Sequence, residues 1–424
     1  MLDGGQGWPL QIAMKMLTAV GAALDAPDLI PVKSAHLVID GTALGVAGRN
    51  FLERLVDEGG RFVIPASINA IAVDRTKPDM SADETDQIRM LEACEKMGAL
   101  PSCSCNPFIQ GLLPAFGEHV AWSESATAPF VNSVLGARTN REGATAVASA
   151  LTGLAPRCGM HLDDNRRGEI LLRVEADIAG VDRFSLLGAL TGRLTGDRVP
   201  VLDGIGQTPS TDDYVAFGAA FAIHGAAAMF HIAGITPEAP DLQTAFGGAV
   251  PVATIVDDAA LDAEHARTAT GTAGPVDIVS IGCPHASLDQ LRAAAAMVAD
   301  QQAADRAGGH ASPAVKFYIH TNRSTYDTAS SEGVIGVLTG AGVSVTGDNC
   351  AVVSYDRVPA GARLATNSAK MALFARSVSN AEILFGSTAQ CIAAGLSGRW
   401  EGLCADNHGS MLMLTRASAA QRAG

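Results

Sequence analysis

The sequence predicts an α/β protein with several domains. Short runs rich in Val and Ile, such as residues 276–281, are typical of buried strands. A capping box formed by Ser287 and Gln290 follows that run and predicts the start of a helix. At 424 residues, with 48% hydrophobic and 17% charged side chains, the chain can bury large cores. Strands interleaved with capped helices in such a composition indicate an α/β body.

The N-terminal region is expected to hold helices, strands and a polar loop. Apolar residues recur at helical spacing from Pro9 to Leu24. Ser81 and Glu84 form a capping box for a helix that runs through Met97. The expected strands are His36–Asp40 and Arg61–Pro65, and the second leads into a polar loop, Ala66–Asn69.

The stretch Tyr214–Ile235 contains no Asp, Glu, Lys or Arg and is long enough to span a bilayer. It is rich in Ala and Gly and holds His224 and His231, so we expect a buried helix that runs into a strand. Further strands are expected at 276–281, Val315–His320, Val343–Thr346 and Ala351–Tyr355. We expect three α/β domains, at residues 1–140, 141–270 and 271–424.

The charge balance excludes some classes of partner. With 44 acidic and 30 basic side chains, the formal net charge is −14. A nucleic-acid surface and a polybasic membrane anchor are therefore not expected. The N-terminus has neither the basic region nor the apolar region of a secretory signal. We expect a soluble, cytoplasmic protein.

The eight cysteines do not predict a disulfide framework in a long chain without a signal peptide. In a reducing compartment they can fill the core, hold a metal or cluster, or act as nucleophiles. Cys105, Cys283 and Cys350 are expected in loops, and Cys283 lies in Gly-Cys-Pro-His between a strand and a helix. Such loops carry the ligand-handling groups of α/β proteins. Three thiolates from distant loops can hold an iron–sulfur cluster with one iron open as a Lewis acid.

Two other uses of the cysteines stay open. Cys391, Cys404 and His408 can be proposed as zinc ligands, although Cys391 is expected inside a helix. Cys283 can be proposed as a nucleophile paired with His285. The chain has no phosphate-binding loop, no Gly-x-Ser-x-Gly motif and no convincing dinucleotide-binding motif, which disfavours a nicotinamide enzyme.

Two segments are candidates for binding an anion. Thr139 and Glu142 form a capping box, and a helix N-terminus flanked by Arg138 and Arg141 would suit a carboxylate or phosphate. Lys370 is expected in the first turn of a helix, where the dipole disfavours a cation unless an anion is bound. The alternatives are a solvated capped helix and a plain surface lysine.

Taken together, the motifs resemble the aconitase X family, the divergent branch of the aconitase superfamily. The most specific string is Asn-Ser-Val-Leu-Gly-Ala-Arg-Thr-Asn-Arg-Glu-Gly at 132–143. The other matching segments, in family order, are Cys105–Phe108, Trp122–Ser125, Gly159–Leu162, Met229–Ala239, Gly282–His285, Asp348–Cys350 and Thr366–Lys370. They reach from near the start of the chain to about residue 400.

The resemblance implies an aconitase-like multidomain α/β/α architecture, an iron–sulfur cluster of unknown nuclearity and a hydro-lyase reaction. Members of the family are cis-3-hydroxy-L-proline dehydratases or mevalonate 5-phosphate dehydratases. The cluster cysteines map onto Cys105, Cys283 and Cys350, with Cys103 as the nearest competitor of Cys105. The chain departs from the family at Phe108, usually Tyr, and at Ala66–Asn69, usually Thr-Thr-Leu-Asn.

The superfamily also carries a small swivelling domain with a Ser-rich loop that supplies the catalytic serine base. We find no such segment in the sequence, so the resemblance implies a large subunit that lacks the C-terminal swivel domain. A separate small subunit is expected to provide the serine.

The resemblance and the residue types together give the expected site. An open iron binds the leaving hydroxyl, and a base removes the proton from the adjacent carbon. The candidate catalytic residues are Glu124, His161, His285 and Lys370. The candidates for holding a small anionic substrate are Ser67, Asn69, Arg138, Thr139, Asn140, Arg141 and Ser368. The expected reaction is dehydration of cis-3-hydroxy-L-proline to 1-pyrroline-2-carboxylate; the alternatives are mevalonate 5-phosphate as substrate and a non-catalytic assembly subunit.

Overall fold

The computed structural model describes residues 1–306, 315–354 and 358–402. Its N-terminal part is built on a three-stranded parallel sheet in the order β3-β2-β4. The strands are β2 (Ala35–Leu37), β3 (Ala66–Ile68) and β4 (Ala121–Trp122). In this register His36, on the central strand, stands between Ser67 and Trp122.

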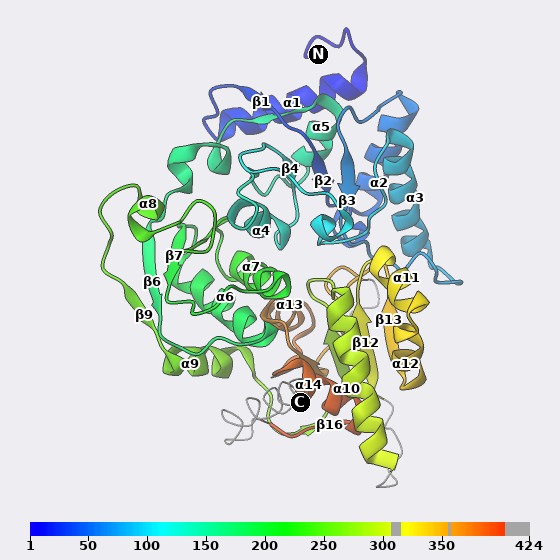
Figure 1. Cartoon of the computed structure of the whole chain (residues 1–424). Helices are drawn as coiled ribbons and strands as arrows, with labels where there is room; N and C mark the ends of the chain where they lie inside the picture. The colour runs from blue at the N-terminus through cyan, green and yellow to red at the C-terminus, as the bar shows by residue number, and fades with distance from the viewer. Residues whose placement is uncertain (307–314, 355–357, 403–424) are drawn as a thin grey trace.

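Helices surround this first sheet, at the top of Figure 1. They are α1 (Trp8–Ala23), α2 (Gly41–Asp57), α3 (Ala82–Met97), α4 (Thr127–Ser133) and α5 (Thr145–Thr152). An antiparallel pair, β1 (Leu29–Pro31) with β5 (Leu154–Pro156), lies beside α1. The predicted capping box of Ser81 and Glu84 is confirmed, and α3 ends at Gly98 in the left-handed conformation.

The middle of the chain forms a four-stranded parallel sheet in the order β8-β7-β6-β9. Its strands are β6 (Ile170–Val174), β7 (Pro200–Asp203), β8 (His231–Ile232) and β9 (Thr254–Val256). Its helices are α6 (Val181–Thr195), α7 (Thr211–His224), α8 (Leu242–Phe246) and α9 (Asp258–Thr268). The predicted buried helix running into a strand is confirmed by α7 and β8.

The C-terminal part is a five-stranded parallel sheet in the order β13-β12-β11-β14-β15. Its strands are β11 (Ile278–Ile281), β12 (Lys316–His320), β13 (Val343–Thr346), β14 (Arg363–Thr366) and β15 (Glu382–Phe385). The helices are α10 (Leu288–Arg306), α11 (Arg323–Ser331), α12 (Val334–Gly340), α13 (Ala369–Ser379) and α14 (Thr388–Ser397). A short pair, β10 (Gly274–Pro275) with β16 (Arg399–Trp400), lies nearby.

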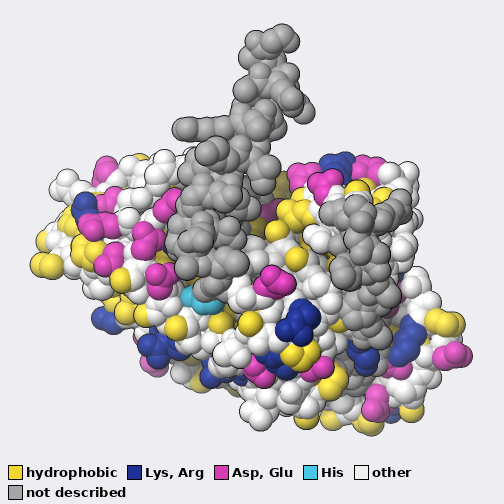
Figure 2. All heavy atoms as spheres, turned by 90° about the horizontal axis from the view of Figure 1, so that it is seen from below, with side chains coloured by type: hydrophobic (Ala, Val, Ile, Leu, Met, Phe, Trp, Pro, Cys, Tyr) yellow, Lys and Arg dark blue, Asp and Glu magenta, His cyan; other side chains and the backbone are white. Residues whose placement is uncertain are grey.

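Short 3₁₀ helices at Pro107–Gln110, Gly159–His161 and Asp163–Arg166 complete the described elements. A buried apolar cluster that includes Phe130, Phe217 and Phe385 joins the three parts of the chain. Within the described ranges, no helix combines the length and the apolar character needed to cross a membrane. On the face seen in Figure 2, Asp and Glu side chains are interspersed with Lys and Arg.

Two predicted strands are wrong. Residues 61–65 bond to helix ends instead of a strand, since the Phe62 amide donates to the Met97 carbonyl and the Val63 amide to Ala150. The strand begins at Ala66, so Ser67 lies in β3 rather than in a loop. Residues 351–353 form a turn, in which the amides of Val353 and Ser354 donate to the Cys350 carbonyl; Tyr355 lies outside the described residues.

Candidate active site

The loops that follow three strands of the five-stranded sheet carry the chemistry-bearing residues of the C-terminal part. Cys283 follows β11, Cys350 follows β13, and Ser368 and Lys370 follow β14. Because these strands are parallel, all three loops leave the same edge of the sheet. The chain continues from β11 to β12 on one side and returns as β14 on the other, so the strand order reverses between β11 and β14. Ligands of open α/β sheets bind at such a reversal.

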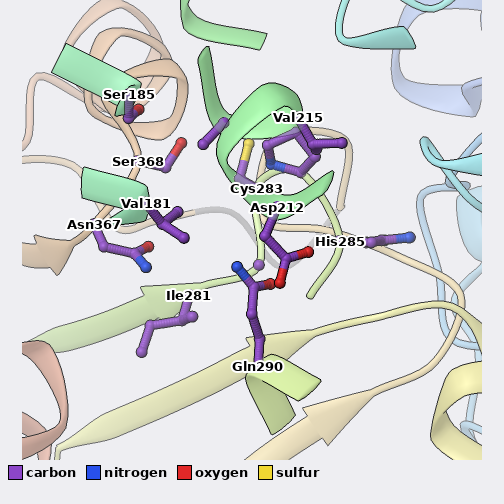
Figure 3. A pocket seen from close by; sticks show the side chains of 13 residues that line it. Val181, Ser185, Asp212, Val215, Ile281, Cys283, His285, Gln290, Asn367 and Ser368 are labelled. Atoms are coloured by element: carbon purple, nitrogen blue, oxygen red, sulfur yellow. The ribbon is translucent and has the colours of Figure 1, made fainter. Parts of the chain in front are cut away.

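Figure 3 shows a small cavity, of about 20 Å³, at this reversal. Cys283, Asn367 and Ser368 line it from the strand-end loops, and Ser185 and Asp212 reach it from α6 and α7. The side chain of His285 points away from the other labelled residues. The cavity therefore joins the middle and C-terminal parts of the chain at the Cys283 loop.

The Cys283 loop needs a glycine before the cysteine. Gly282 has φ of 93°, and a Cβ atom there would lie 2.1 Å from the carbonyl oxygen of His320. No other residue fits this close approach of two strand ends. The Ser287–Gln290 capping box then starts α10, as the sequence predicts.

A buried ion pair connects the first sheet to the C-terminal sheet. Lys370 Nζ donates to Glu124 Oε1 at 2.8 Å. The other carboxylate oxygen of Glu124 accepts from Asn69 Nδ2 at 2.9 Å, and Oε1 also accepts from the Ala126 amide at 3.0 Å. Lys370 reaches the hydroxyl of Ser125 at 3.5 Å. Glu124 follows β4 and Asn69 follows β3, so both belong to the carboxyl edge of the first sheet.

The pair is charged in the folded protein. Burial would raise the pKa of Glu124, but the Lys370 ammonium and the Ala126 amide outweigh it and lower that pKa to about 2. Burial would lower the pKa of Lys370, but the Glu124 carboxylate raises it above its ordinary value. Each charge is therefore stable in the interior because the other is present.

Cys105 lies in the loop between α3 and the 3₁₀ helix Pro107–Gln110, against the Cys283 loop. Its sulfur accepts from the His285 amide at 3.2 Å, and Thr127 Oγ1 donates to its carbonyl at 2.5 Å. Asn106 Nδ2 donates to the His285 carbonyl at 3.0 Å. Cys105 is thus placed by backbone contacts with a segment 180 residues further along the chain.

The Cys350 loop is held by a network of charged side chains. Asp348 is fully buried and accepts from Arg75 at 2.8 Å and from Arg323 at 2.6 Å. Asp74 accepts from Arg323 at 2.6 Å and from the Gly347 amide at 2.9 Å. Arg75 and Asp74 come from the first part of the chain, so this network fixes the Cys350 loop to it.

The three thiols share one electrostatic environment. Burial raises the pKa of each, to about 12 for Cys283, and the nearby Lys370 ammonium opposes this rise for all three. A thiol with a raised pKa is a poor nucleophile by itself. Among the described residues, no hydrogen bond joins the His285 ring to the Cys283 thiol, because the ring points away from Cys283 (Figure 3) and its Nε2 atom lies 3.1 Å from the Asn349 carbonyl.

The donor set fits an iron–sulfur cluster. In the described part of the chain, no three His, Cys, Asp or Glu side chains converge enough to hold a single metal ion. A cluster distributes its cysteine ligands over several iron atoms, so the thiols need not meet at one point. One residue beside each cysteine has a buried atom with no hydrogen-bond partner among the described residues: Asn106 Oδ1, His285 Nδ1 and Asn349 Oδ1. Such atoms are typical of a site that takes a bound group.

A second group of predicted residues lies around His161. Its Nδ1 atom is 3.0 Å from His119 Nδ1, and its Nε2 atom is 3.4 Å from Glu142 Oε1. Arg138 donates to the His161 carbonyl at 3.4 Å and pairs with Asp163. Among the described residues, no hydrogen bond or ion pair joins these side chains to Glu124 or Lys370.

The predicted helix start at Thr139 and Glu142 is wrong. The helix begins at Thr145, because the Thr139 hydroxyl is bonded to the Trp122 amide at 2.9 Å instead of capping its own segment. Arg138 and Arg141 therefore do not flank a helix N-terminus. Arg141 is exposed and donates to the Ala222 carbonyl at 3.2 Å.

The other predicted residues of this string have structural contacts. Asn140 Oδ1 accepts from the Met160 amide at 2.8 Å, and its Nδ2 atom donates to the Cys158 carbonyl at 3.2 Å.

Phe108, where the family usually has Tyr, is buried and stacks on Phe130 at 4.1 Å between ring centroids.

Of the competing cysteines, Cys103 interacts with the charges of Arg75 and Asp348 rather than with the other two thiols. Cys391 is buried in α14. Its proposed zinc partners Cys404 and His408 lie outside the described residues.

Sequence reasoning missed His36. Its Nδ1 atom lies 2.8 Å from Ser67 Oγ; burial lowers the pKa of its ring, and the Glu124 carboxylate opposes that shift. It stands at the centre of an apolar run that predicts only a buried strand, so no local signal marks it.

Comparison with known proteins places this geometry in a family. The first, second and third domains of aconitase X match residues 1–164, 168–266 and 276–397. A solved structure, Thermococcus kodakaraensis aconitase X in its holo-form, superposes with a TM-score of 0.81 at 30% identity and covers 92% of this chain and 96% of that one.

Two curated relatives are of different specificity. The cis-3-hydroxy-L-proline dehydratase of Hypocrea jecorina is 35% identical over 94% of this chain and 68% of its own length. The phosphomevalonate dehydratase large subunit of Methanothermobacter thermautotrophicus is 34% identical over 84% of this chain and 86% of its own length. Their names are those of hydro-lyases, and the family models together span most of the sequence. The chain belongs to the aconitase X family.

Proposed function

We propose that this protein is a hydro-lyase that removes water from a small hydroxy acid. The observation that carries the proposal is an arrangement of loops around the buried Glu124–Lys370 pair: the buried Cys105 sulfur is bonded to the Cys283 loop, and the buried Cys283 and Cys350 follow strands at the same sheet edge as Lys370. An ion pair that only stabilises the fold needs no thiol nearby, and a thiol that only fills the core needs no charged group nearby. Together they supply what an elimination needs: a site for a Lewis acid, a fixed negative group and a fixed positive group.

Cys105, Cys283 and Cys350 would hold an iron–sulfur cluster. When bound, such a cluster supplies an open iron that acts as a Lewis acid toward a hydroxyl. His285 lies two residues after Cys283 in the same loop. Because a carbonyl only accepts, the bond from His285 Nε2 to the Asn349 carbonyl leaves Nδ1 as a bare acceptor, which can orient a departing water.

Lys370 and Glu124 hold the substrate in this proposal. An ammonium group has three donors, and those of Lys370 have Glu124 and Ser125 as partners among the described residues. A third donor can then meet a substrate carboxylate. Glu124 stays ionised and can orient a substrate N–H or hydroxyl.

The proton on the adjacent carbon would be removed by a serine from a separate small subunit. Several relatives carry the name of a large subunit, among them the phosphomevalonate dehydratases of Methanothermobacter thermautotrophicus and Methanocaldococcus jannaschii. A partner of that kind would supply this base.

The preferred substrate is cis-3-hydroxy-L-proline, giving 1-pyrroline-2-carboxylate. Two of the three predicted lysine and arginine residues of the site already have carboxylate partners, since Lys370 pairs with Glu124 and Arg138 with Asp163. A zwitterion without net charge suits such a site better than a substrate with both a carboxylate and a phosphate. The second candidate is mevalonate 5-phosphate, because relatives with that activity in their names are matched over 86% to 98% of their length.

The test is anaerobic purification of the chain with a small-subunit partner, followed by assays with both substrates. We expect a coloured, iron-containing protein that converts cis-3-hydroxy-L-proline. If only mevalonate 5-phosphate is converted, it takes the place of cis-3-hydroxy-L-proline as the substrate. An iron-free protein that is inactive on both compounds would indicate a non-catalytic assembly subunit.

The ligand assignment has its own matched control. Cys350→Ala should lose most of the iron, whereas Cys391→Ala, a buried cysteine of α14, should keep it. Iron content and the visible spectrum are the readouts. Equal iron in the two variants would contradict the assignment of Cys350.

A further inference from the structure

His36 lies at the centre of the first sheet, fully buried, between the active-site loop after β3 and the strand that leads to Glu124. One ring nitrogen, Nδ1, lies 2.8 Å from Ser67 Oγ. The other, Nε2, has no hydrogen-bond partner among the described residues. A histidine that only filled the core would gain nothing from a polar ring in this place.

The neighbouring amide determines which nitrogen of His36 carries the proton. Asn69 must turn Nδ2 toward Glu124, because an ionised carboxylate can only accept. Its Oδ1 atom is then an acceptor, and it is also buried without a partner among the described residues. The Asn69 backbone amide donates to the Leu37 carbonyl at 2.8 Å, next to His36 on β2, so the two unmatched buried atoms complement each other when Nε2 is a donor.

With the proton on Nε2, Nδ1 is a bare acceptor and accepts a hydrogen bond from the Ser67 hydroxyl. The series that we infer runs from Ser67 to His36, from His36 Nε2 toward the unmatched Asn69 Oδ1 atom, and from Asn69 to Glu124, which pairs with Lys370. Burial lowers the pKa of His36 to about 4, so the ring stays neutral and keeps this direction.

We propose that His36 is a positioning residue of the active site, which holds the Asn69 amide, and through it the Glu124 carboxylate, with a proton fixed on Nε2. The inference rests on the proposed function, in which Glu124 and Lys370 hold the substrate. It adds a residue that acts on them through Asn69 without touching the substrate.

The first experiment measures the tautomer and needs no turnover. The full chain has ten histidines, and ¹⁵N-histidine labelling with long-range ¹H–¹⁵N correlations distinguishes protonated from bare ring nitrogens. The resonance that disappears in His36→Gln is assigned to His36. We expect a neutral ring protonated on Nε2 at pH 7.

Two further variants test the direction of the bonds. Ser67→Ala should leave the proton on Nε2, since Asn69 still accepts it. Asn69→Leu removes that acceptor and should move the proton to Nδ1, where Ser67 can accept. A ring protonated on Nδ1 in the unmodified chain, a charged ring, or an unchanged tautomer in Asn69→Leu would overturn the proposal.

The second experiment separates positioning from packing. His36→Gln retains an amide near the position of Nε2, whereas His36→Asn retains one near Nδ1. If His36 acts through Asn69, kcat should fall about 10- to 100-fold in His36→Asn and less in His36→Gln, with KM little changed. A packing role alone would lower kcat in both variants in step with their melting temperatures, and that outcome would overturn the proposal. If the unmodified enzyme dehydrates neither substrate, the proposed function fails while the tautomer measurement still decides the role of His36 toward Asn69.

Discussion

Lys370 Nζ lies 2.8 Å from Glu124 Oε1, although the two residues are 246 positions apart in the chain. Lys370 occupies the first turn of α13, where the helix dipole disfavours a cation. The sequence predicts an anion at this position, and the carboxylate of Glu124 fills that role. The anion belongs to the protein, so the positive charge is compensated before any substrate arrives.

Removing the cation should therefore cost both stability and activity. In Lys370→Met the Glu124 carboxylate is left buried without its partner, which typically costs about 3–5 kcal/mol. The free energy of unfolding, measured with urea, should fall by about that amount. The double variant Lys370→Met/Glu124→Gln should recover part of the stability but no activity. A double variant no more stable than the single one would contradict the coupling.

His36 should make folding sensitive to acid. Its pKa is lowered from 6.5 to about 4, mainly by burial and against the pull of the nearby Glu124 carboxylate, so between these values the unfolded chain binds more protons. Stability then falls as pH falls through this window, by about 3 kcal/mol for this residue, and is fully present above pH 6.5. Urea unfolding at several pH values should give a flatter profile for His36→Gln than for the unmodified chain. Parallel profiles would contradict this.

The charged network around Asp348 should control both stability and iron content. Asp348→Asn weakens the contacts with Arg75 and Arg323, and should lower the free energy of unfolding by about 3 kcal/mol. Because the Cys350 loop depends on this network, the iron content should fall with it. Glu332→Gln is the control, since its pair with Arg292 is on the surface. Equal iron in both variants would show that the Cys350 loop does not depend on this network to hold iron.

Gly282 should tolerate no side chain. Gly282→Ala combines a positive φ with a clash against the His320 carbonyl. Gly333→Ala has a similar φ, 78°, with no atom within 4 Å of the added Cβ, so it reports the cost of the backbone conformation alone. The Gly282 variant should be about 1–3 kcal/mol less stable than this control. Thermal unfolding of the two proteins gives the comparison.

The family predicted from the sequence motifs is confirmed, and so is the α/β fold class. Local sequence signals were sufficient to place a residue that comes directly after a strand, as for Cys283 and Lys370. They failed where a distant segment competes for a hydrogen bond. The Thr139 hydroxyl has the spacing of a helix cap but bonds to the Trp122 amide, 17 residues away. The domain boundaries and the roles of the site residues stay predictions.

The contacts of the site also explain what sequence cannot show. Asn69, Glu124 and His36 come from three strands of the first sheet, and only the register of β2 between β3 and β4 brings them together. Nothing in the local pattern around His36 distinguishes it from an ordinary buried strand residue. Its partners become visible only when the strand order is known.

The order of the cysteines along the chain has a consequence for biosynthesis. Cys105 leaves the ribosome early, whereas Cys350 and its neighbour Lys370 are made near the end of the chain. Since N-terminal domains generally fold first, the first sheet can form while two of the three thiols are still unsynthesised. For the proposed cluster, delivery of iron and sulfide to all three would then be a post-translational event, and chains arrested before Cys350 would carry Cys105 and Cys283 without the third thiol.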